Sequence, residues 1–499
     1  MQRITQLLAK VLSSRRFGVV LLAFFVFEAL WIAFSGIYPL AFDEEFHWGI
    51  IRFYSDHWLP FVSSQPPGSG QYGPIIADPS YLFHYLMSFP YRVLHFFTQN
   101  DTALILMLRL MNIALFTAGL VLFYKLLRRV GSSRLLTNAA LSVFVLIPIA
   151  PLLAAHINYD NLMMLLVAWS CWLVLDIYRD LQKRVINLKT YATLVLVIML
   201  SSLVKYAFLP IAFAIALYVV YQLGRTFKGR DKQFRTALAK SHNALTNRAK
   251  VGLLVLLVAS AGLFAQRYVA NTVRYHTPLP DCSAVLSVKE CLAYGPWERD
   301  YRFAKEKGEF NHSPVKFTRA WFNGMHRRLF FMITGKTRGY MNYPPMPVLA
   351  KTSTVLAVVG VLALLVYWRR VFAGHRELYF LLLVMLVYCA VLWVYGYKDY
   401  LSTGRPVAIN GRYLLMILFP FMALAGRALA IALRRYQAAR VWVAAIVIAL
   451  FLQGGGVLSF ILRSNERWYW PNAMVTHINN GARQLLKPVV IEGKNSPDN

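Results

Sequence analysis

The fold of this chain is decided first by residues 17–48, which read FGVVLLAFFVFEALWIAFSGIYPLAFDEEFHW. The apolar part, Phe17–Leu40, exceeds the about 20 residues that a helix needs to cross a ~30 Å hydrocarbon core. It lacks a small-residue cleavage site and is long for a signal-peptide core, so we expect a retained membrane-spanning helix. Only basic charges precede it, which predicts a cytoplasmic N-terminus.

Similar apolar runs recur along the 499 residues and bring the predicted transmembrane helices to about eleven. The further runs are 104–124, 135–153, 160–178, 190–204, 206–222, 251–268, 352–368, 378–395, 411–432 and 441–462. The stretch 190–222 is either one long helix or two short helices hinged at Lys205–Pro210. We expect an all-α polytopic membrane protein, with a membrane domain at 1–462 and a short extracytoplasmic tail at 463–499.

The composition excludes other classes of protein. The chain is 58% hydrophobic and 15% charged, whereas soluble domains average about 25% charged residues. An aromatic content of 15% excludes intrinsic disorder. The net charge of +31 comes from basic residues in the connections expected to be cytoplasmic, so the positive-inside rule explains it without nucleic acid.

Two long connections are expected on the non-cytoplasmic side, at 41–100 and 269–350. The second contains Cys282 and Cys291, which are either a local disulfide or two free thiols. A bridge over so short a loop would stabilise the fold by roughly 2–3 kcal/mol in the chain-entropy model.

The first long connection opens with three carboxylates, Asp43-Glu44-Glu45. Apolar residues then recur at helical spacing over 44–57, which predicts a helix lying on the membrane surface. Asp43 is either its N-cap or a general base facing the water–lipid boundary. His47 lies on the same face and is either a surface histidine, a metal ligand or a proton relay. A second interfacial or re-entrant helix is expected over Ser80–Phe97.

Further polar residues occur where predicted spans reach the same side. Asn158 and Asp160 lie at the beginning of one span. They are either helix caps or contacts to a substrate. Lys205 interrupts an apolar stretch. It is either a snorkelling side chain or an anion site. Arg412 opens another span at headgroup depth, where a guanidinium can hold a phosphate in two hydrogen bonds, and Arg405 precedes it.

Two charges fall inside predicted spans. Glu28 lies in the middle of the first, and Arg109 lies near the outer end of the next. Both are candidates for function, or for a structural pair with each other. The chain contains no Walker loop, His-Glu-x-x-His, Cys-x-x-Cys or Gly-x-Ser-x-Gly motif.

The order of these segments resembles the GT-C superfamily of multi-spanning glycosyltransferases, close to its protein-mannosyltransferase and aminoarabinose-transferase branch. It is also similar to uncharacterised bacterial polytopic membrane proteins of that type. The resemblance rests on Asp43-Glu44 directly after the first span, Asn158-x-Asp160, Lys205-Tyr206 and Gly411-Arg412-Tyr413-Leu414-Leu415. One departure is Ala77-Asp78-Pro79-Ser80-Tyr81, where the family often has a Pro-Pro-Leu-Tyr-like sequence.

This resemblance implies inverting transfer of a sugar from a polyprenyl-phosphate carrier to a lipid, glycan or protein acceptor at the outer membrane face. It implies that Asp43 is the general base and that Glu44 shapes the pocket or holds the acceptor. Lys205 and Arg412, with Tyr413 beside them, would bind the carrier phosphate. The location implied is a bacterial inner membrane rather than the endoplasmic reticulum.

Two other functions are compatible with the sequence: a flippase or transporter of a lipid-linked glycan, and a non-catalytic protein of envelope assembly. The sequence specifies no cofactor and leaves a requirement for a divalent cation open. It also leaves open the sugar, the acceptor and the oligomeric state.

Overall fold

The structure is a computed structural model that describes residues 1–41, 43–62, 64–330, 332–334, 341–343 and 346–490. Helices make up 77% of it. One short antiparallel hairpin, β1 (Met332–Thr334) with β2 (Met341–Tyr343), is the exception among the described segments. Phe42, which precedes the acidic motif, lies outside the described residues.

Within these residues, eight helices are long and apolar enough to cross a membrane. They are α2 (Arg15–Ser35), α5 (Asp101–Arg129), α8 (Tyr159–Gln182), η2 with α10 (Tyr206–Phe208 and Leu209–Phe227), α12 with η3 and α13 (Asn247–Phe264, Ala265–Val269 and Ala270–Tyr275), α18 (Pro347–Phe372), α19 (Leu378–Thr403), and η4 with α20 (Gly411–Leu414 and Leu415–Ala432). The prediction of a helical, polytopic membrane protein is confirmed at this level.

Three shorter apolar helices coincide with the remaining predicted runs. They are α6 (Arg134–Val145), α9 (Leu188–Val204) and α21 (Gln437–Phe451). The number of about eleven transmembrane helices stays a prediction.

The smaller helices connect these elements or cover the ends of the bundle. They are α1 (Gln2–Leu12), α3 (Glu44–Ser55), η1 (Ser69–Tyr72), α4 (Leu82–Phe97), α7 (Ile149–Ala154), α11 (Asp231–Ala244), α14 (Cys282–Val285), α15 (Val288–Cys291), α16 (Gly295–Lys305), α17 (Pro314–Arg327), α22 (Val457–Arg463), η5 (Glu466–Trp468) and α23 (Ala473–Leu486).

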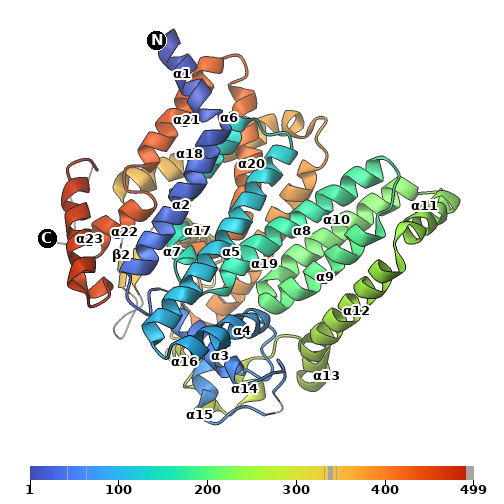
Figure 1. Cartoon of the computed structure of the whole chain (residues 1–499), viewed down its shortest axis with the longest axis vertical. Helices are drawn as coiled ribbons and strands as arrows, with labels where there is room; N and C mark the ends of the chain where they lie inside the picture. The colour runs from blue at the N-terminus through green and yellow to red at the C-terminus, as the bar shows by residue number, and fades with distance from the viewer. Residues whose placement is uncertain (42, 63, 331, 335–340, 344–345, 491–499) are drawn as a thin grey trace.

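The long helices pack side by side in one bundle (Figure 1). The α5 helix lies against α8, and a Cβ added at Gly119 would meet the Leu165 nitrogen at 2.7 Å, so this close approach requires glycine. The α12 helix packs along α9 at the edge of the bundle and leaves most of its apolar surface exposed. An apolar, uncovered helix of this kind is typical of a lipid-facing surface.

Two of the predicted runs are broken in the structure, and the alternative left open for the stretch 190–222 is decided. The stretch 190–222 forms two helices, because Lys205 adopts an extended backbone between α9 and η2. The run 135–153 divides into α6 and α7 around Pro148. Proline has no backbone N–H, so it cannot donate the hydrogen bond that would continue the helix. The run 441–462 divides into α21 and α22 at Gly454–Gly456, where Gly454 and Gly456 have positive φ. Gly456 also approaches Glu28 too closely for a side chain.

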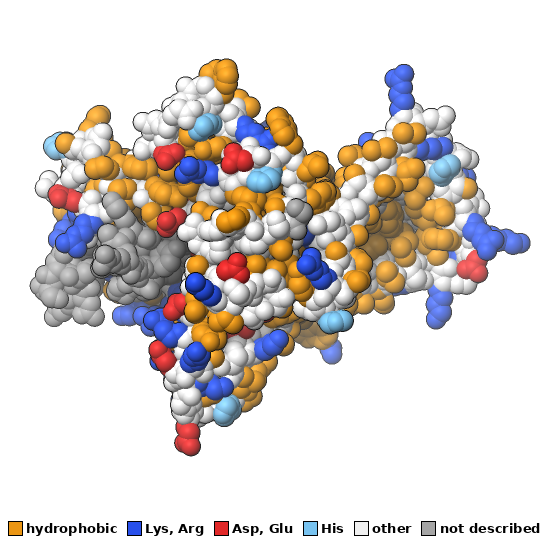
Figure 2. Space-filling view, turned by 90° about the horizontal axis from the view of Figure 1, so that it is seen from below, with side chains coloured by type: hydrophobic (Ala, Val, Ile, Leu, Met, Phe, Trp, Pro, Cys, Tyr) orange, Lys and Arg blue, Asp and Glu red, His pale blue; other side chains and the backbone are white. Residues whose placement is uncertain are grey.

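The two long connections cover one end of the bundle. The α3 and α4 helices lie against each other there, and α14 to α16 lie beside them (Figure 1). Cys282 and Cys291 form a disulfide in this region, and the backbone oxygen of Glu290 lies 2.8 Å from the position of a Cβ on Gly70. The two connections are therefore packed together. Seen from this end, acidic and basic side chains are mixed across the surface (Figure 2).

The C-terminal segment packs against the bundle as far as Val490, and its location outside the cytoplasm stays a prediction. Asn479 of α23 is completely buried and accepts a hydrogen bond from Trp31 Nε1 of α2 at 3.0 Å. Its amide nitrogen donates to Ser35 Oγ at 3.0 Å. Tyr469 pairs with Gly36 in an isolated β-bridge, so residues far beyond the last span hold the end of the first.

Candidate functional site

Asp43 stands at the N-cap position of α3, but its carboxylate does not cap the helix. The Arg412 Nη2 donates to Asp43 Oδ2 at 2.7 Å instead. The Asp43 side chain is 40% exposed, whereas that of Arg412 is only 6% exposed. The capping interpretation of Asp43 is therefore wrong, and the carboxylate is the accessible member of a pair whose cation is buried.

A second ion pair lies next to the first. Lys205 Nζ is 2.5 Å from Asp160 Oδ1, and Arg412 Nε is 3.9 Å from Asp160 Oδ2. Asp160 is almost completely buried. It therefore links the two cations, and we call Asp43, Arg412, Asp160 and Lys205 the charged cluster.

Local backbone structure delivers each member to the same place. The α8 helix begins here and α9 ends here, so Asp160 in a first turn meets Lys205 just after a last turn. Asn158 is the N-cap of α8 and accepts a hydrogen bond from the Asp160 nitrogen at 2.9 Å. Asn158 thus caps the helix, and the Asp160 carboxylate is available to pair with Lys205. Arg412 lies in η4, before α20 begins.

Aromatic rings surround the two cations. Lys205 Nζ lies 4.4 Å from the centre of the Tyr159 ring and 5.2 Å from that of Tyr413. The Arg412 guanidinium lies 5.3 Å from the centre of the Tyr413 ring. Ring faces attract cations and exclude water, so they strengthen the field that the cluster presents to an anion. Tyr413 is thus next to both cations, as expected.

The charge state of the cluster follows from its surroundings. Burial alone would raise the pKa of Asp43, but attraction to Arg412 and the hydrogen bond from it, with smaller effects of Lys205 and His156, lower the pKa below its ordinary value. Burial lowers the pKa of His156 to about 4. At neutral pH Asp43 is therefore ionised and His156 is neutral.

Glu44 does not belong to this cluster, which corrects the expectation that it shapes the pocket or holds the acceptor. Its side chain is completely buried, and Arg109 donates to both carboxylate oxygens at 2.8 Å. The backbone nitrogens of Leu40 and Ile157 also donate to it, at 2.6 and 3.2 Å. Burial would raise the pKa of Glu44, but the attraction and hydrogen bonds of Arg109 outweigh it and lower the pKa. Glu44 anchors the start of α3 and thereby positions Asp43.

Arg109 and Glu28 do not pair with each other. Arg109 pairs with Glu44 and also donates to the carbonyl oxygens of Ala33 and Gly36, at 2.9 and 2.6 Å. Glu28 accepts a hydrogen bond from the Val457 nitrogen at 2.9 Å. Both intramembrane charges hold helix ends together.

His47 is completely buried, so the interpretation as a surface histidine is wrong. Its Nδ1 lies 2.8 Å from Nε2 of His84, which is also buried, on α4. The His47 ring is 4.5 Å from that of Tyr159 and so borders the charged cluster. Burial lowers the pKa of His47 well below its ordinary value and that of His84 to about 3, so the pair is neutral.

Sequence reasoning did not identify three residues near the site. They are His84, Tyr159 and Ile157, whose backbone nitrogen donates to Glu44. His84 shares a face of α4 with buried apolar residues, and this amphipathic pattern is the signal that could have indicated it. Arg405, in contrast, was expected at the site but is 56% exposed and lies 3.6 Å from Glu306 instead.

No group of three or more His, Cys, Asp or Glu among the described residues is arranged to hold a metal ion. The cluster itself offers two carboxylates, but each is already paired with a cation. The two carboxylates and the two cations of the cluster therefore balance one another in formal charge.

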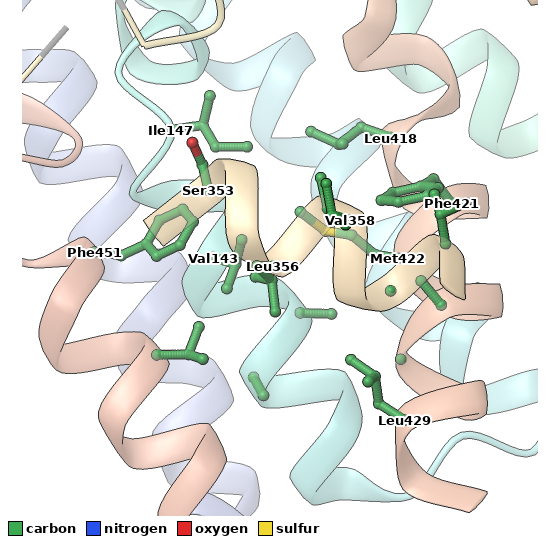
Figure 3. Close-up of a pocket in the computed structure, with 18 of the residues that line it drawn as sticks. Val143, Ile147, Ser353, Leu356, Val358, Leu418, Phe421, Met422, Leu429 and Phe451 are labelled. Carbon is green, nitrogen blue, oxygen red and sulfur yellow. The ribbon is translucent and has the colours of Figure 1, made fainter. Parts of the chain in front are cut away.

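An apolar cavity of about 640 Å³ lies between the helices of the bundle. Leu414, two residues after Arg412, lines one end of it, and its walls come from α6, α17, α18, α20 and α21. Figure 3 shows side chains such as Leu356, Met422 and Phe451 pointing into it from three of these helices. The cavity follows α20 from Leu414 to Leu433, about 28 Å at a rise of 1.5 Å per residue, which is close to the thickness of a hydrocarbon core.

Comparison with known proteins found no matching family model, no matching curated protein and no matching solved structure. The chemistry of the site is therefore the basis for a functional assignment.

Proposed function

We propose that this protein is a glycosyltransferase that moves a sugar from a polyprenyl-phosphate carrier to an acceptor at the membrane surface, with inversion at the anomeric carbon. We further propose that the end carrying α3 and α4 faces the non-cytoplasmic side of a bacterial inner membrane, because basic residues dominate the connections at the other end.

The observation that carries this proposal is the combination of the charged cluster with the apolar cavity. A partly exposed carboxylate contacts a buried arginine, and a second buried cation lies next to them. A cavity lined by apolar side chains begins within two residues of Arg412. A ligand with a phosphate head and a long apolar tail fits this combination of cations and apolar surface.

Each residue then has a defined role. The Asp43 carboxylate accepts the proton of the acceptor hydroxyl or amine as the acceptor attacks the anomeric carbon. The bond between this carbon and the carrier phosphate oxygen breaks, and the phosphate leaves with both electrons. Arg412 and Lys205 stabilise the negative charge on the leaving phosphate.

The ion pairs also connect donor binding with base strength. With no donor present, Arg412 holds the pKa of Asp43 low, and Asp43 is a weak base. When Arg412 turns toward a carrier phosphate, Asp43 loses part of the attraction and hydrogen bonding that lower its pKa. The pKa of Asp43 then rises, so the base becomes strong only when the donor is in place.

The test is Asp43→Asn in the purified full-length protein, assayed with a radiolabelled polyprenyl-phosphate sugar. Loss of a general base typically costs 10²–10⁴-fold in rate, so we expect a decrease in transfer of about that size. Asp56→Asn is the matched control, because Asp56 is exposed at the other end of α3. Unchanged transfer by Asp43→Asn, with folding equal to that of the control, would exclude Asp43 as the base.

A flippase for a lipid-linked glycan is the second candidate, and the length of the cavity along α20 favours it. In reconstituted vesicles, a flippase would move the labelled lipid between leaflets without changing it. Movement that persists in Asp43→Asn, with no sugar transfer in the unsubstituted protein, would replace the glycosyltransferase assignment.

A further inference from the structure

A second cavity, of about 420 Å³, lies at the opposite end of α20 from the charged cluster. Three arginines line it: Arg427 in the last turns of α20, Arg434 in the link to α21, and Arg440 in the first turn of α21. The α5–α6 turn closes it with backbone and hydroxyl groups at Gly131–Ser133. Among the described residues, no carboxylate belongs to its lining.

Two of the three arginines, Arg427 and Arg440, donate hydrogen bonds to backbone oxygens. In the part of the chain that the structure describes, none of the three forms an ion pair. Arg427 donates Nε to the Val371 oxygen, and Arg440 donates Nε to the Leu433 oxygen, both at 3.0 Å. These bonds use one N–H of each guanidinium and fix its plane. Glu377 is the acid whose charge acts on Arg427, and its Oε1 lies 3.0 Å from His375 Nδ1.

This basic cavity is continuous with the apolar one. Ser133, Leu136, Ala430 and Arg440 line both. The side chains that Figure 3 shows in the apolar part carry almost no polar atoms, with the Ser353 hydroxyl as the oxygen seen there. The two cavities together therefore present three like charges at a membrane face and an apolar channel that leads from them into the bundle.

We infer that this is a binding site for an anionic glycerophospholipid, with its phosphate among Arg427, Arg434 and Arg440 and one acyl chain in the adjoining apolar cavity. Three like charges around one cavity of about 420 Å³ repel one another, and a bound anion would relieve this repulsion. Basic pockets between membrane helices bind anionic lipid headgroups. The apolar continuation selects an anion with a tail over a soluble one.

This inference rests on arginines at the other end of α20, none of which belongs to the charged cluster, while its acyl chain would occupy the same apolar cavity as the tail of the proposed carrier. A lipid bound here would hold α20 against α21 and α6.

The headgroup is tested by native mass spectrometry of the full-length protein in detergent, titrated with phosphatidylglycerol or with phosphatidylcholine. We expect phosphatidylglycerol to bind in preference. Each arginine near an anionic lipid contributes about fivefold in affinity, which corresponds to ~1 kcal/mol, so Arg434→Gln with Arg440→Gln should weaken binding about 25-fold. Arg435→Gln is the matched control, since Arg435 is exposed, adjacent to Arg434 and outside the cavity.

The tail is tested by Leu362→Trp, which places a large side chain in the apolar cavity. Leu362 is 55% exposed and lines the cavity, so the substitution fills space without disturbing a packed core. Leu365→Trp is the control on the same helix, because Leu365 is 66% exposed and does not line the cavity. We expect weaker phosphatidylglycerol binding in Leu362→Trp only.

Three results would overturn the inference. The first is equal binding of phosphatidylglycerol and phosphatidylcholine, or equal effects of the arginine variants and Arg435→Gln. The second is complete displacement of the lipid by millimolar inorganic phosphate, which would indicate a site for a soluble anion. The third is displacement by a polyprenyl phosphate with no specific binding of phosphatidylglycerol, which would indicate a second carrier site.

Discussion

Glu44→Gln is expected to destabilise the protein strongly although it changes one atom of the side chain. Glu44 accepts four hydrogen bonds in a completely buried site, two from Arg109 and one each from the nitrogens of Leu40 and Ile157. An amide has one acceptor oxygen, so about two of these bonds are lost, and the charge of Arg109 is left without a counter-ion.

The magnitude follows from these losses. Hydrogen bonds to charged groups contribute about 1.5–3 kcal/mol each, and breaking a buried pair from one side costs about 3–5 kcal/mol. We therefore expect the free energy of unfolding to fall by about 3–5 kcal/mol. Because the folded-state pKa of Glu44 is lowered, its contribution is present above the unfolded pKa of about 4.3 and is lost as the pH falls through the folded pKa.

The assay is equilibrium unfolding in mixed micelles of detergent and denaturing surfactant, at pH 7 and at decreasing pH. Glu45→Gln is the matched control, since Glu45 is the next residue and is exposed. The reasoning would be refuted if Glu44→Gln and Glu45→Gln had equal stability at pH 7. It would also be refuted if the stability difference between Glu44→Gln and the unsubstituted protein did not shrink in acid.

Three further predictions concern the site and its surroundings. Arg412→Gln should move the acid limb of the pH dependence of kcat/KM to higher pH, because the pKa of Asp43 is then raised by burial without the opposing cation. His84→Phe should lessen the loss of stability below about pH 6.5. The buried His84 has a lowered pKa, so below this pH the proton binds the unfolded state in preference and stability falls by up to about 1.4 kcal/mol per pH unit. Reduction of the disulfide between Cys282 and Cys291 should speed proteolysis of residues 282–294 and cost roughly 2–3 kcal/mol locally, while the melting of the membrane helices stays unchanged.

Each of these has its own control. Lys189→Gln removes a charge remote from the cluster and should leave the pH profile unchanged. His242→Gln alters an exposed histidine and should keep the acid loss of stability seen in the unsubstituted protein. A reduced protein whose 282–294 segment remains as resistant to protease as the oxidised form would contradict the third prediction.

Much of the helical architecture followed from apolar runs, because a helix in lipid must satisfy its own backbone and must be about 20 apolar residues long. The breaks were harder to foresee. Lys205 interrupts its run visibly, but the division at Gly454–Gly456 depends on Glu28 lying against that glycine turn. A contact between α2 and the turn before α22 cannot be derived from local periodicity.

The candidate site shows the same division. Sequence position alone predicted that Asp43, Asp160, Lys205 and Arg412 reach one face, since each follows or precedes a span at the same end. Asp43 and Glu44 are adjacent acids with equal claims in the sequence, and local pattern does not separate them. The tertiary structure does, because it places Arg109 against Glu44 and Arg412 against Asp43.

The amino-acid sequence by itself thus determined a multi-helix membrane protein and the end at which its polar residues gather, because burial of apolar runs and alternation of sides are local properties. Only the tertiary structure decided that Glu44 turns to Arg109 as an anchor while Asp43 turns to Arg412. The physical reason is distance along the chain: Asp43 and Arg412 are 369 residues apart, and their pairing depends on how every helix between them packs.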